Sequence, residues 1–418
     1  MNKGIAVFGT GYVGLVQGLA LNHIGNRVYL VDIDNNKIDM IKNRKSPIFE
    51  EGIDGMLSKY SSETLIPTTN ASMALDNTDI IFVCVGTPNH NGRQDTRYIE
   101  NACRTIGRHL KDSDFKIIVV KSTVYPGLTN GLIRRVLEEE SGKKAGIDFG
   151  LAMNPEFLRQ GTALSDFYNV ERNVIGVEDD RSKRALLELY SFISDKNVIC
   201  RISEAELIKY AANSFLAVKI SYANEIGNLC KRIGVDSHKV LSIVGKDSRI
   251  GEKFLESGIG YGGSCFPKDV SALESYFRER DVACNVISAA KKTNKEQPHK
   301  IIQIMGEDHD INGKNIGILG LSFKPGTDDV RESPAIPIIE SILKLGGNIN
   351  AHDPAAMNNM KRLFPKINYY TNPQETISSS DIILVLSNWK DYETLNYRGK
   401  PVYMGRRLSR VEGIGIAW

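Results

Sequence analysis

The chain has 418 residues, of which 41% are hydrophobic and 25% are charged, and its formal net charge is +3. This length exceeds one ordinary hydrophobic core, so we expect two or three domains of a normal globular composition. The small net charge and the lack of a long basic run argue against nucleic acid as a partner, and no apolar run approaches the roughly 20 residues of a membrane span.

The first 200 residues have the pattern of an α/β domain with a doubly wound parallel sheet. A strand-like stretch at 5–8 leads into the glycine motif GTGYVG at 9–14 and then into a helical stretch. A second strand is expected at 28–31, and the apolar runs at 80–85 and 117–120 are typical of buried parallel strands.

The glycine motif predicts a dinucleotide site. It follows a strand and opens a helix, and Asp32 closes the next strand about 20 residues further on. Gly9 permits a tight turn, Gly11 lets the backbone approach a pyrophosphate, and Gly14 lets the helix pack on the strand. The helix N-terminus then faces the phosphates. Asp32 suits the ribose hydroxyls and repels a 2′-phosphate, which favours NAD over NADP, although FAD or another nucleotide remains an alternative.

A second strand end is placed to touch the same dinucleotide. Val85, Gly86 and Thr87 follow the expected strand at 80–85. The alternative is a plain turn that ends the strand.

Residues 201–295 are expected to form a helical centre. The stretch 204–233 contains no proline and predicts one long helix, and a second helix is expected from Pro267 to about Arg280. A long helix between two α/β domains often serves as a subunit contact, so we expect a homodimer or a higher oligomer.

Residues 296–418 repeat the order of the first domain. The run at 316–320 resembles 5–9, the strand ending at His352 and Asp353 resembles the one ending at Asp32, and 381–386 resembles 79–84. We therefore expect two Rossmann-like doubly wound domains joined by a central long-helix region. The second copy lacks GxGxxG, so no dinucleotide is expected there.

Cys265 is the sharpest candidate for chemistry. The chain has six cysteines in no CxxC pair and no metal-ligand spacing, which indicates free thiols in a reducing cytoplasm and no metal site. Cys265 lies in the glycine-rich loop GYGGSCFPKD just before an expected helix, where the helix dipole stabilises a thiolate. It is either a nucleophile or a packed loop cysteine.

Two further segments supply polar groups. Lys209 and Asn213 are one helical turn apart and share a face, where they suit an alkoxide oxygen, unless the lysine simply faces solvent. Thr123 and Glu156 are expected at the carboxyl edge of the parallel sheet, where ligands bind, although such a threonine is often only a local hydrogen bonder.

Together these segments resemble the UDP-glucose/GDP-mannose dehydrogenase family along essentially the whole chain. The shared motifs are GTGYVG, VGTP, KSTV, NPEFL, KYAANSF, GYGGSCFPKD and GLSFKPGTDDVRES. The resemblance implies oxidation of the C6 hydroxymethyl group of UDP-glucose to a carboxylate by two NAD. Related enzymes for N-acetylated sugars typically have His where this chain has Ser264, and those for GDP-mannose tend to have Leu where it has Phe266.

The resemblance also implies roles for residues. Cys265 is the nucleophile that forms a thiohemiacetal and then a thioester, and Lys209 and Asn213 steady the oxygen at C6. Asp269 handles protons with Thr123 and a water, and Glu156 assists hydrolysis of the thioester.

The remaining expected contacts fall into two sets. Contacts with NAD are expected from the glycine motif and strand ends together with Tyr12, Val13, Lys37, Thr123, Glu156, Lys268 and Arg331. Contacts with the UDP-sugar are expected from Glu156, Phe157, Leu158, Lys209, Asn213, Arg249, Phe254, Tyr261, Gly262, Phe323, Lys324 and Arg406. Arg249 and Arg406 would bind the diphosphate or uridine, across a subunit boundary in one arrangement.

Two positions depart from the family pattern. Gln160 stands where many relatives have a second glutamate, and an amide cannot act as a base. Met404 precedes Gly405 and Arg406 where relatives often have Asp.

Other functions fit the sequence less well. A short-chain epimerase needs a Tyr-x-x-x-Lys pair, and none of the 16 tyrosines has Lys four residues later. A non-catalytic nucleotide-sugar sensor would not need Cys265, Lys209, Asn213 and Asp269, and a two-electron hydroxyacid dehydrogenase would leave Cys265 unexplained. GDP-mannose and N-acetylated UDP-sugars remain alternative substrates.

Overall fold

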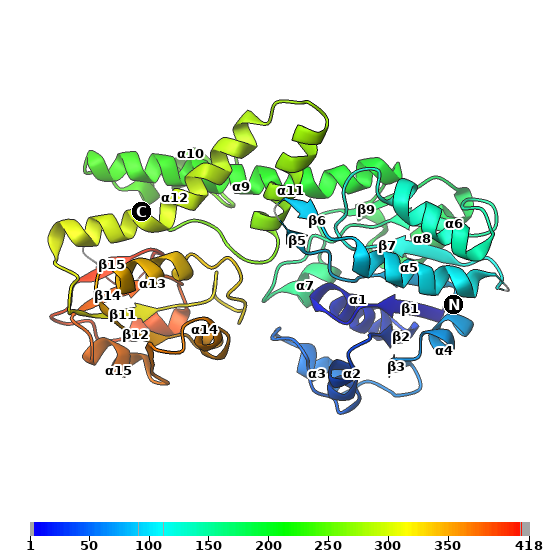
Figure 1. Cartoon of the computed structure of the whole chain (residues 1–418), viewed down its shortest axis with the longest axis horizontal. Coiled ribbons are helices and arrows are strands. Elements are labelled where there is room, and N and C mark those ends of the chain that lie inside the picture. The colour runs from blue at the N-terminus through cyan, green and yellow to red at the C-terminus, as the bar shows by residue number, and fades with distance from the viewer. Residues whose placement is uncertain (1–3, 91, 112, 410, 412–418) are drawn as a thin grey trace. The chain divides into compact units, whose positions relative to one another are not determined.

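The structure is a computed structural model that describes residues 4–90, 92–111, 113–409 and 411. The chain divides into two compact units, Met1–Ala211 and Ala212–Trp418. The division falls within helix α9 (Ile202–Arg232), which runs without a break (Figure 1). The domain boundaries expected at residues 200 and 295 stay a prediction.

The first unit is built on an eight-stranded sheet with the strand order β10-β9-β8-β7-β4-β1-β2-β3. Its neighbours pair in parallel except β8 with β9, which are antiparallel. The order β3-β2-β1-β4-β7-β8 is that of a dinucleotide-binding domain. The strands are β1 (Gly4–Phe8), β2 (Arg27–Val31), β3 (Leu65–Thr68), β4 (Ile80–Val83), β7 (Ile117–Val120), β8 (Gly150–Met153), β9 (Asn173–Val177) and β10 (Asn197–Cys200), and a separate hairpin pairs β5 (Asn89–His90) with β6 (Arg93–Gln94).

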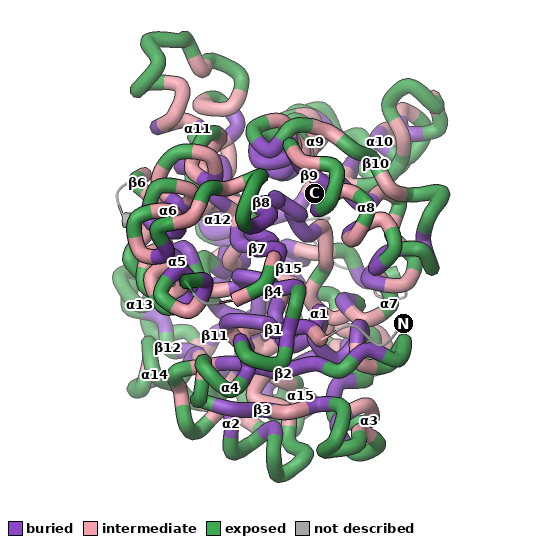
Figure 2. The backbone as a smooth tube through the Cα atoms, turned by 90° about the vertical axis from the view of Figure 1, so that its right-hand side faces the viewer, coloured by how far each residue is buried: buried purple, intermediate pink, exposed green. Residues whose placement is uncertain are grey.

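Helices cover both faces of this sheet, and each face has its own core. Ile5 and Val7 pack into one apolar cluster, whereas Ala6 and Phe8 pack into the other, because successive side chains of a strand point to opposite faces. Strands β1, β4 and β7 are therefore buried almost throughout (Figure 2). The helices are α1 (Tyr12–His23), α2 (Asn35–Lys42), α3 (Ile53–Leu57), α4 (Ala71–Asp76), α5 (Arg97–Leu110), α6 (Arg134–Ser141), α7 (Ala163–Tyr168) and α8 (Asp180–Leu189), with short π and 3-10 segments at η1 (Thr129–Ile133) and η2 (Ser191–Lys196).

The second unit begins with helices and ends in a smaller sheet. After α9 come α10 (Ser237–Gly245), α11 (Phe266–Glu279) and α12 (Asn285–Asp308). The five-stranded sheet has the order β13-β12-β11-β14-β15 and is parallel throughout. Its elements are β11 (Asn315–Leu319), α13 (Ala335–Lys344), β12 (Asn348–His352), α14 (Met357–Leu363), β13 (Asn368–Tyr369), α15 (Pro373–Ser378), β14 (Ile382–Val385), η3 (Lys390–Thr394) and β15 (Val402–Met404).

The predicted fold class is confirmed: two Rossmann-like sheets are joined by a region of long helices. The strand order β13-β12-β11-β14-β15 matches the central order of the first sheet, so the repeat expected between the two ends of the chain is present. Helix α12 continues to Asp308 and so crosses the expected boundary at residue 295 without a break.

Two features are absent from the part of the chain that the structure describes. None of the helices there combines the length and the apolar character that crossing a membrane requires. No group of three or more His, Cys, Asp or Glu side chains in that part of the chain is arranged to hold a metal ion.

Candidate active site

The glycine motif forms a tight turn between β1 and α1. Gly9 has a φ of +95°, which suits glycine, and a Cβ on Gly14 would lie 1.8 Å from the carbonyl oxygen of Gly9. A Cβ on Gly11 would meet nothing within 4 Å, and no side chain caps the N-terminus of α1. The turn therefore leaves open space beside unpaired backbone N–H groups, which is the arrangement that binds a pyrophosphate.

Asp32 lies directly after β2, as the motif requires. Its carboxylate accepts hydrogen bonds from the Thr10 amide and the Thr10 hydroxyl, both at 2.7 Å, and from the Asp34 amide at 3.0 Å. Burial raises the pKa of the Asp32 carboxyl, but these hydrogen bonds and the nearby Lys37 outweigh burial and hold the pKa below its ordinary value. Asp32 is therefore held as an ionised hydrogen-bond acceptor at the end of β2.

Tyr12 and Glu50 together hold the segment that follows Glu156. The Gly161 amide donates to the Tyr12 hydroxyl at 3.1 Å and to the Glu50 carboxylate at 2.6 Å. Glu50 also accepts from the Ala163 amide at 2.7 Å. Glu50 was not among the predicted site residues, since nothing in its local pattern marks a carboxylate that binds two distant amides. Tyr12 links the cofactor turn to the segment that contains Gln160.

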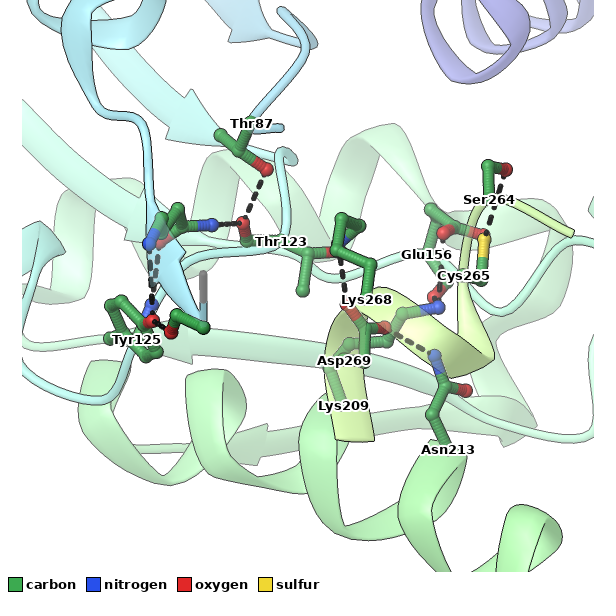
Figure 3. A network of polar contacts seen from close by, with 12 residues as sticks. Thr87, Thr123, Tyr125, Glu156, Lys209, Asn213, Ser264, Cys265, Lys268 and Asp269 are labelled. Atoms are coloured by element: carbon green, nitrogen blue, oxygen red, sulfur yellow. Dashed lines mark hydrogen bonds and ion pairs between the residues drawn. The ribbon is translucent and has the colours of Figure 1, made fainter. Parts of the chain in front are cut away.

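The strand ends at β4 and β7 meet around the carbonyl oxygen of Thr123. The Thr87 hydroxyl donates to this oxygen at 2.8 Å, and the Gln94 amide donates to it at 2.5 Å. Gln94 also accepts from the Tyr125 amide at 3.3 Å. Figure 3 shows Thr87, Thr123 and Tyr125 in this network. Gln94 is a residue that the sequence analysis missed, because the short hairpin that carries it has no motif.

Lys209 and Glu156 form a buried ion pair in the first unit. The Lys209 ammonium donates to the Glu156 carboxylate at 3.0 Å and to the Glu156 carbonyl oxygen at 2.7 Å. Only 4% of the Lys209 side chain and 8% of the Glu156 side chain are exposed, so the solvent-facing alternative for Lys209 is wrong. The pair joins α9 to the turn that follows β8.

Two neighbours complete the surroundings of Glu156. The Leu158 amide donates to the second carboxylate oxygen at 2.7 Å, and the Lys209 ammonium lies 5.3 Å from the centre of the Phe157 ring. Burial raises the pKa of the Glu156 carboxyl, but Lys209, the Leu158 amide and Lys121 outweigh burial and lower it. Glu156 is therefore held as a carboxylate.

Asn213 and Asp269 form the corresponding cluster in the second unit. Asn213 lies one helical turn after Lys209 on α9, and its amide donates to the Asp269 carboxylate at 2.6 Å. Lys268 binds the other oxygen of the same carboxylate, which is 1% exposed (Figure 3). Helix α9 thus carries one residue of each cluster.

Cys265 is exposed and occupies the N-cap of α11. The helix begins at Phe266, so Pro267 is its second residue, whereas we expected Pro267 to be the first. The Ser264 hydroxyl lies 3.7 Å from the Cys265 sulfur. Asp329 raises the pKa of the Arg331 guanidinium, and Cys265 adds to that increase, which places Arg331 within the electrostatic surroundings of the thiol. A thiol at a helix N-terminus near a guanidinium is placed to act as a thiolate nucleophile.

The loop before Cys265 is held by three amide side chains from two helices of the second unit, α12 and α9. Asn294 on α12 donates to the Tyr261 carbonyl oxygen at 3.0 Å and accepts from the Tyr261 amide at 2.7 Å. Gln297 donates to the Gly258 carbonyl oxygen at 2.9 Å, and Asn224 on α9 accepts from the Gly258 amide at 2.8 Å. These three amides were also missed, because each binds a backbone group that is far away in the sequence.

The loop also packs directly on the C-terminal Rossmann-like domain. The Gly263 amide donates to the Arg331 carbonyl oxygen at 2.9 Å, and a Cβ on Gly263 would lie 2.8 Å from the Phe323 ring. A Cβ on Gly262 would lie 2.1 Å from the Glu332 carbonyl oxygen. These glycines are therefore required by close approach of the backbone, and they bring Phe323 beside the cysteine loop.

The other residues expected to bind substrate are aromatic and basic side chains of the second unit. The Phe254 and Tyr261 rings lie 6.1 and 5.9 Å from the Phe266 ring, at the start of α11. The Lys324 ammonium lies 5.9 Å from the Phe323 ring. The two arginines have partners within the chain. Arg406 donates to the Gly260 carbonyl oxygen, and Arg249, whose side chain is 87% exposed, binds Asp247 at 2.6 Å.

The fold and the site define a class of protein. A dinucleotide-binding domain with an acidic strand end, a second Rossmann-like domain and an exposed helix-capping cysteine are the parts of an NAD-dependent dehydrogenase.

The chain belongs to the UDP-glucose/GDP-mannose dehydrogenase family. Residues 3–194 match the NAD binding domain of that family, residues 203–296 match its central domain, and residues 317–409 match its UDP binding domain. The protein is thus an NAD-dependent dehydrogenase, and the resemblance seen in the motifs is confirmed.

Individual relatives agree with the family over nearly the whole chain. The chain is 38% identical to the UDP-glucose 6-dehydrogenase AglM of Haloferax volcanii over 98% of both chains. It is 40% identical to the UDP-glucose 6-dehydrogenase TuaD of Bacillus subtilis over 99% of this chain and 91% of that protein. A UDP-glucose dehydrogenase structure from Pyrobaculum islandicum matches with a TM-score of 0.94 and 37% identity, covering 98% of this chain and 95% of that one.

Proposed function

We propose that the protein oxidises the C6 hydroxymethyl group of UDP-glucose to the carboxylate of UDP-glucuronate, with two NAD consumed for each sugar. The relatives named above as UDP-glucose 6-dehydrogenases support this substrate, and the family's UDP binding domain supports a UDP-sugar. The observation that carries the proposal is the exposed Cys265 at the N-cap of α11, because a simple alcohol dehydrogenase needs no such thiol.

The first oxidation converts the alcohol to an aldehyde. NAD accepts the hydride from C6, and the hydroxyl proton passes to Asp269, with Thr123 and a water taking part. Lys209 and Asn213 steady the oxygen at C6 as its negative charge develops, since hydrogen-bond donors fixed in place stabilise an oxyanion. Both donors lie on α9, and each is already paired with a carboxylate, Glu156 or Asp269, that fixes its position.

The second oxidation requires a nucleophile. The Cys265 thiolate adds to the aldehyde carbon to form a thiohemiacetal, which loses its hydride to the second NAD and becomes a thioester. Water then attacks the thioester, the thiolate leaves, and the carboxylate is released. The ionised Glu156 assists this water.

The expected contact residues divide into one set for NAD and one set for the UDP-sugar. The pyrophosphate and ribose of NAD would meet the turn at Gly9, Gly11, Tyr12, Val13 and Gly14, with Asp32 and Lys37 at the ribose and Val85, Gly86, Thr87, Lys268 and Arg331 as further contacts. The UDP-sugar would meet Phe157, Leu158, Phe254, Tyr261, Gly262, Phe323, Lys324 and, at its charged groups, Arg249 and Arg406. The unpaired N–H groups of α1 and the lowered pKa of Asp32 support the NAD contacts.

The substrate is tested by measuring kcat/KM for UDP-glucose, GDP-mannose and UDP-N-acetylglucosamine in parallel. We expect UDP-glucose to exceed the other two by at least about 100-fold, because a missing or misplaced polar group costs several kcal/mol in a site built for it. The GDP-mannose alternative is kept because a GDP-mannose dehydrogenase structure from Pseudomonas aeruginosa is 34% identical to this chain, with a TM-score of 0.59. A higher kcat/KM for GDP-mannose would replace the proposed substrate.

We also propose that the enzyme works as a homodimer in the cytoplasm. Phe215, Tyr222 and Leu229 are spaced at intervals of seven residues along α9 and are each at least half exposed, which forms an apolar stripe along one side of the helix. A second copy of the same helix would cover this stripe. None of the six cysteines forms a disulfide in the structure, which is typical of a protein in a reducing compartment.

A further inference from the structure

A lysine at the end of β7 is buried and has no role in the chemistry described above. Lys121 follows Val120 directly and is 5% exposed. Its ammonium donates to the Asn154 side-chain oxygen at 2.8 Å and lies 3.4 Å from the Asn154 carbonyl oxygen. Asn154 stands two residues before Glu156, so Lys121 binds the same turn that carries this carboxylate.

The other partners of Asn154 are neutral. The Tyr190 hydroxyl donates to the same side-chain oxygen at 2.7 Å, and Gln17 on α1 donates to the Tyr190 hydroxyl at 3.0 Å. The Asn154 amide donates to the Asn173 side chain at 2.9 Å. All five residues are buried, and Lys121 is the only charged one among them. This network joins α1, whose N-terminus faces the cofactor turn, to the turn at Glu156.

A buried ammonium without a carboxylate at hydrogen-bond distance is costly. Burial lowers the pKa of the Lys121 ammonium to about 8, with Cys84 and Glu156 acting to raise it and Lys209 acting to lower it. Glu156 is therefore the carboxylate that favours the charged form of Lys121, and Lys121 in turn lowers the pKa of Glu156. Glu156 thus lies in the field of two ammonium groups, one paired with it directly and one acting through the turn.

We propose that Lys121 is a positioning residue for Glu156: through Asn154 it holds the turn at 154–156, and its buried charge acts on the Glu156 carboxylate that assists thioester hydrolysis. This inference rests on the proposed function. The charged groups that act on Glu156 are Lys209 on α9 and Lys121 after β7, and the buried thiol of Cys84 after β4 is a further titratable neighbour.

The same strand supplies a matched control. Lys116 precedes β7 just as Lys121 follows it, and it is buried to the same degree, at 6% exposed. Its ammonium donates to the Thr78 carbonyl oxygen at 2.5 Å, and the carboxylates that act on it are Asp79, Asp76 and Asp114. Lys116→Met removes a buried ammonium at the opposite end of the strand from Glu156.

The first test is the pH profile of kcat for UDP-glucose oxidation. Loss of the Lys121 charge raises the pKa of Glu156, so the acid limb of the profile should move to higher pH in Lys121→Met and in Lys121→Gln. Lys121→Gln keeps a donor for Asn154 but not the charge. The limb should stay in place in Lys116→Met. An unmoved limb in Lys121→Gln would overturn the role of the charge and leave only the hydrogen bond.

The second test needs no substrate, so its failure can be told apart from failure of the proposed function. Urea midpoints are measured for wild type, Lys121→Met, Glu156→Gln and the double variant. Lys121→Met should lower the midpoint less when Glu156 is already Gln, because the favourable charge interaction is then absent. Equal losses in the two backgrounds would overturn the coupling. If UDP-glucose were not oxidised to the acid at all, the proposed function would fail, and this cycle would still report the interaction of Lys121 with Glu156.

Discussion

The ion pair of Glu156 with Lys209 is almost completely buried, so water solvates neither charge well. Both carboxylate oxygens of Glu156 already accept hydrogen bonds, one from Lys209 and one from the Leu158 amide. Such a pair contributes little net stability against an apolar replacement, but removal of one partner leaves the other charge buried and unpaired. The pair therefore serves to hold two polar groups in fixed positions on the turn and on α9.

Glu156→Gln should destabilise the protein by about 3–5 kcal/mol at pH 7, because it strips the buried Lys209 of its counter-charge. The folded-state pKa of Glu156 is lowered. A lowered carboxyl pKa contributes stability that is fully present above the unfolded-state pKa of about 4.3 and is lost as the pH falls through the folded-state pKa. Urea unfolding at several pH values measures the effect. The difference between wild type and variant should stay constant from pH 6 to 8 and shrink below about pH 4, and a difference that grew on acidification would contradict this assignment.

Asp269 is the buried carboxylate of the cluster in the second unit and the proposed proton acceptor. Asp269→Asn should lower kcat by about 10²–10⁴-fold with a smaller change in KM, since general acid–base groups contribute by that amount. Asp195→Asn is the matched control, because Asp195 pairs with Lys196 at the protein surface. Steady-state kinetics with NADH absorbance gives both constants. Activity retained in Asp269→Asn would remove Asp269 from the chemistry.

The loop that leads to Cys265 is the element on which the chemistry depends most. Asn294 binds both backbone groups of Tyr261, so the loop is fixed before substrate arrives. Asn294→Ala should lower kcat about tenfold and cost about 1–3 kcal/mol of stability, because two buried backbone groups lose their partner. Gln374→Ala is the control, since Gln374 makes the same paired hydrogen bonds to Asn396 on an exposed surface. Equal loss of activity in Asn294→Ala and Gln374→Ala would mean that activity does not depend specifically on the hydrogen bonds from Asn294 to the loop.

Helix α9 is the element that we expect to hold two protomers together. Phe215→Glu places a charge in the apolar stripe, and it should convert the dimer to a monomer in size-exclusion chromatography with light scattering. Leu363→Glu is the control, because Leu363 is 52% exposed on α14, compared with 63% for Phe215. A wild-type protein that eluted as a monomer would disprove the dimer outright.

At the same scale, elements with a strong local signal were predictable from the sequence. The strand predicted at 117–120 has the same limits in the structure, because its Ile and Val run is bounded by lysines. The helix predicted at 204–233 is observed as Ile202–Arg232, since that stretch has no proline. The strands β8, β9 and β10 were not predicted. The runs that form them are short, and their pairing is decided by the neighbouring strands.

Side chains that act over long distances in the sequence were beyond prediction. Cys265, Lys209, Asn213 and Asp269 could be proposed as site residues because their motifs are local. Gln94, Asn224 and Asn294 were missed, because an amide that binds a distant backbone group leaves no periodic pattern. Lys116 and Lys121 have the usual appearance of polar residues that flank a buried strand, and only the structure reveals that both are buried.

The whole molecule uses one architecture for two purposes. In the first domain the turn after β1 is left open beside Gly11. In the second domain the amides of Leu321 and Ser322 donate to Asp353, at 2.8 and 3.1 Å, much as the Thr10 amide donates to Asp32 at 2.7 Å in the first domain. Both turns therefore use this contact with a carboxylate, and they differ in that only the first contains GxGxxG.

The central claim is a four-electron oxidation that passes through Cys265. It is tested most directly by counting the NADH formed per UDP-glucose consumed, for wild type and for Cys265→Ser. The account predicts two NADH for wild type, and for the variant no more than about one NADH per active site before the reaction stalls, because no thiolate adds to the aldehyde. One NADH per sugar from wild type would mean that the enzyme stops at a carbonyl, and full turnover of Cys265→Ser to the acid would mean that the cysteine is not the nucleophile.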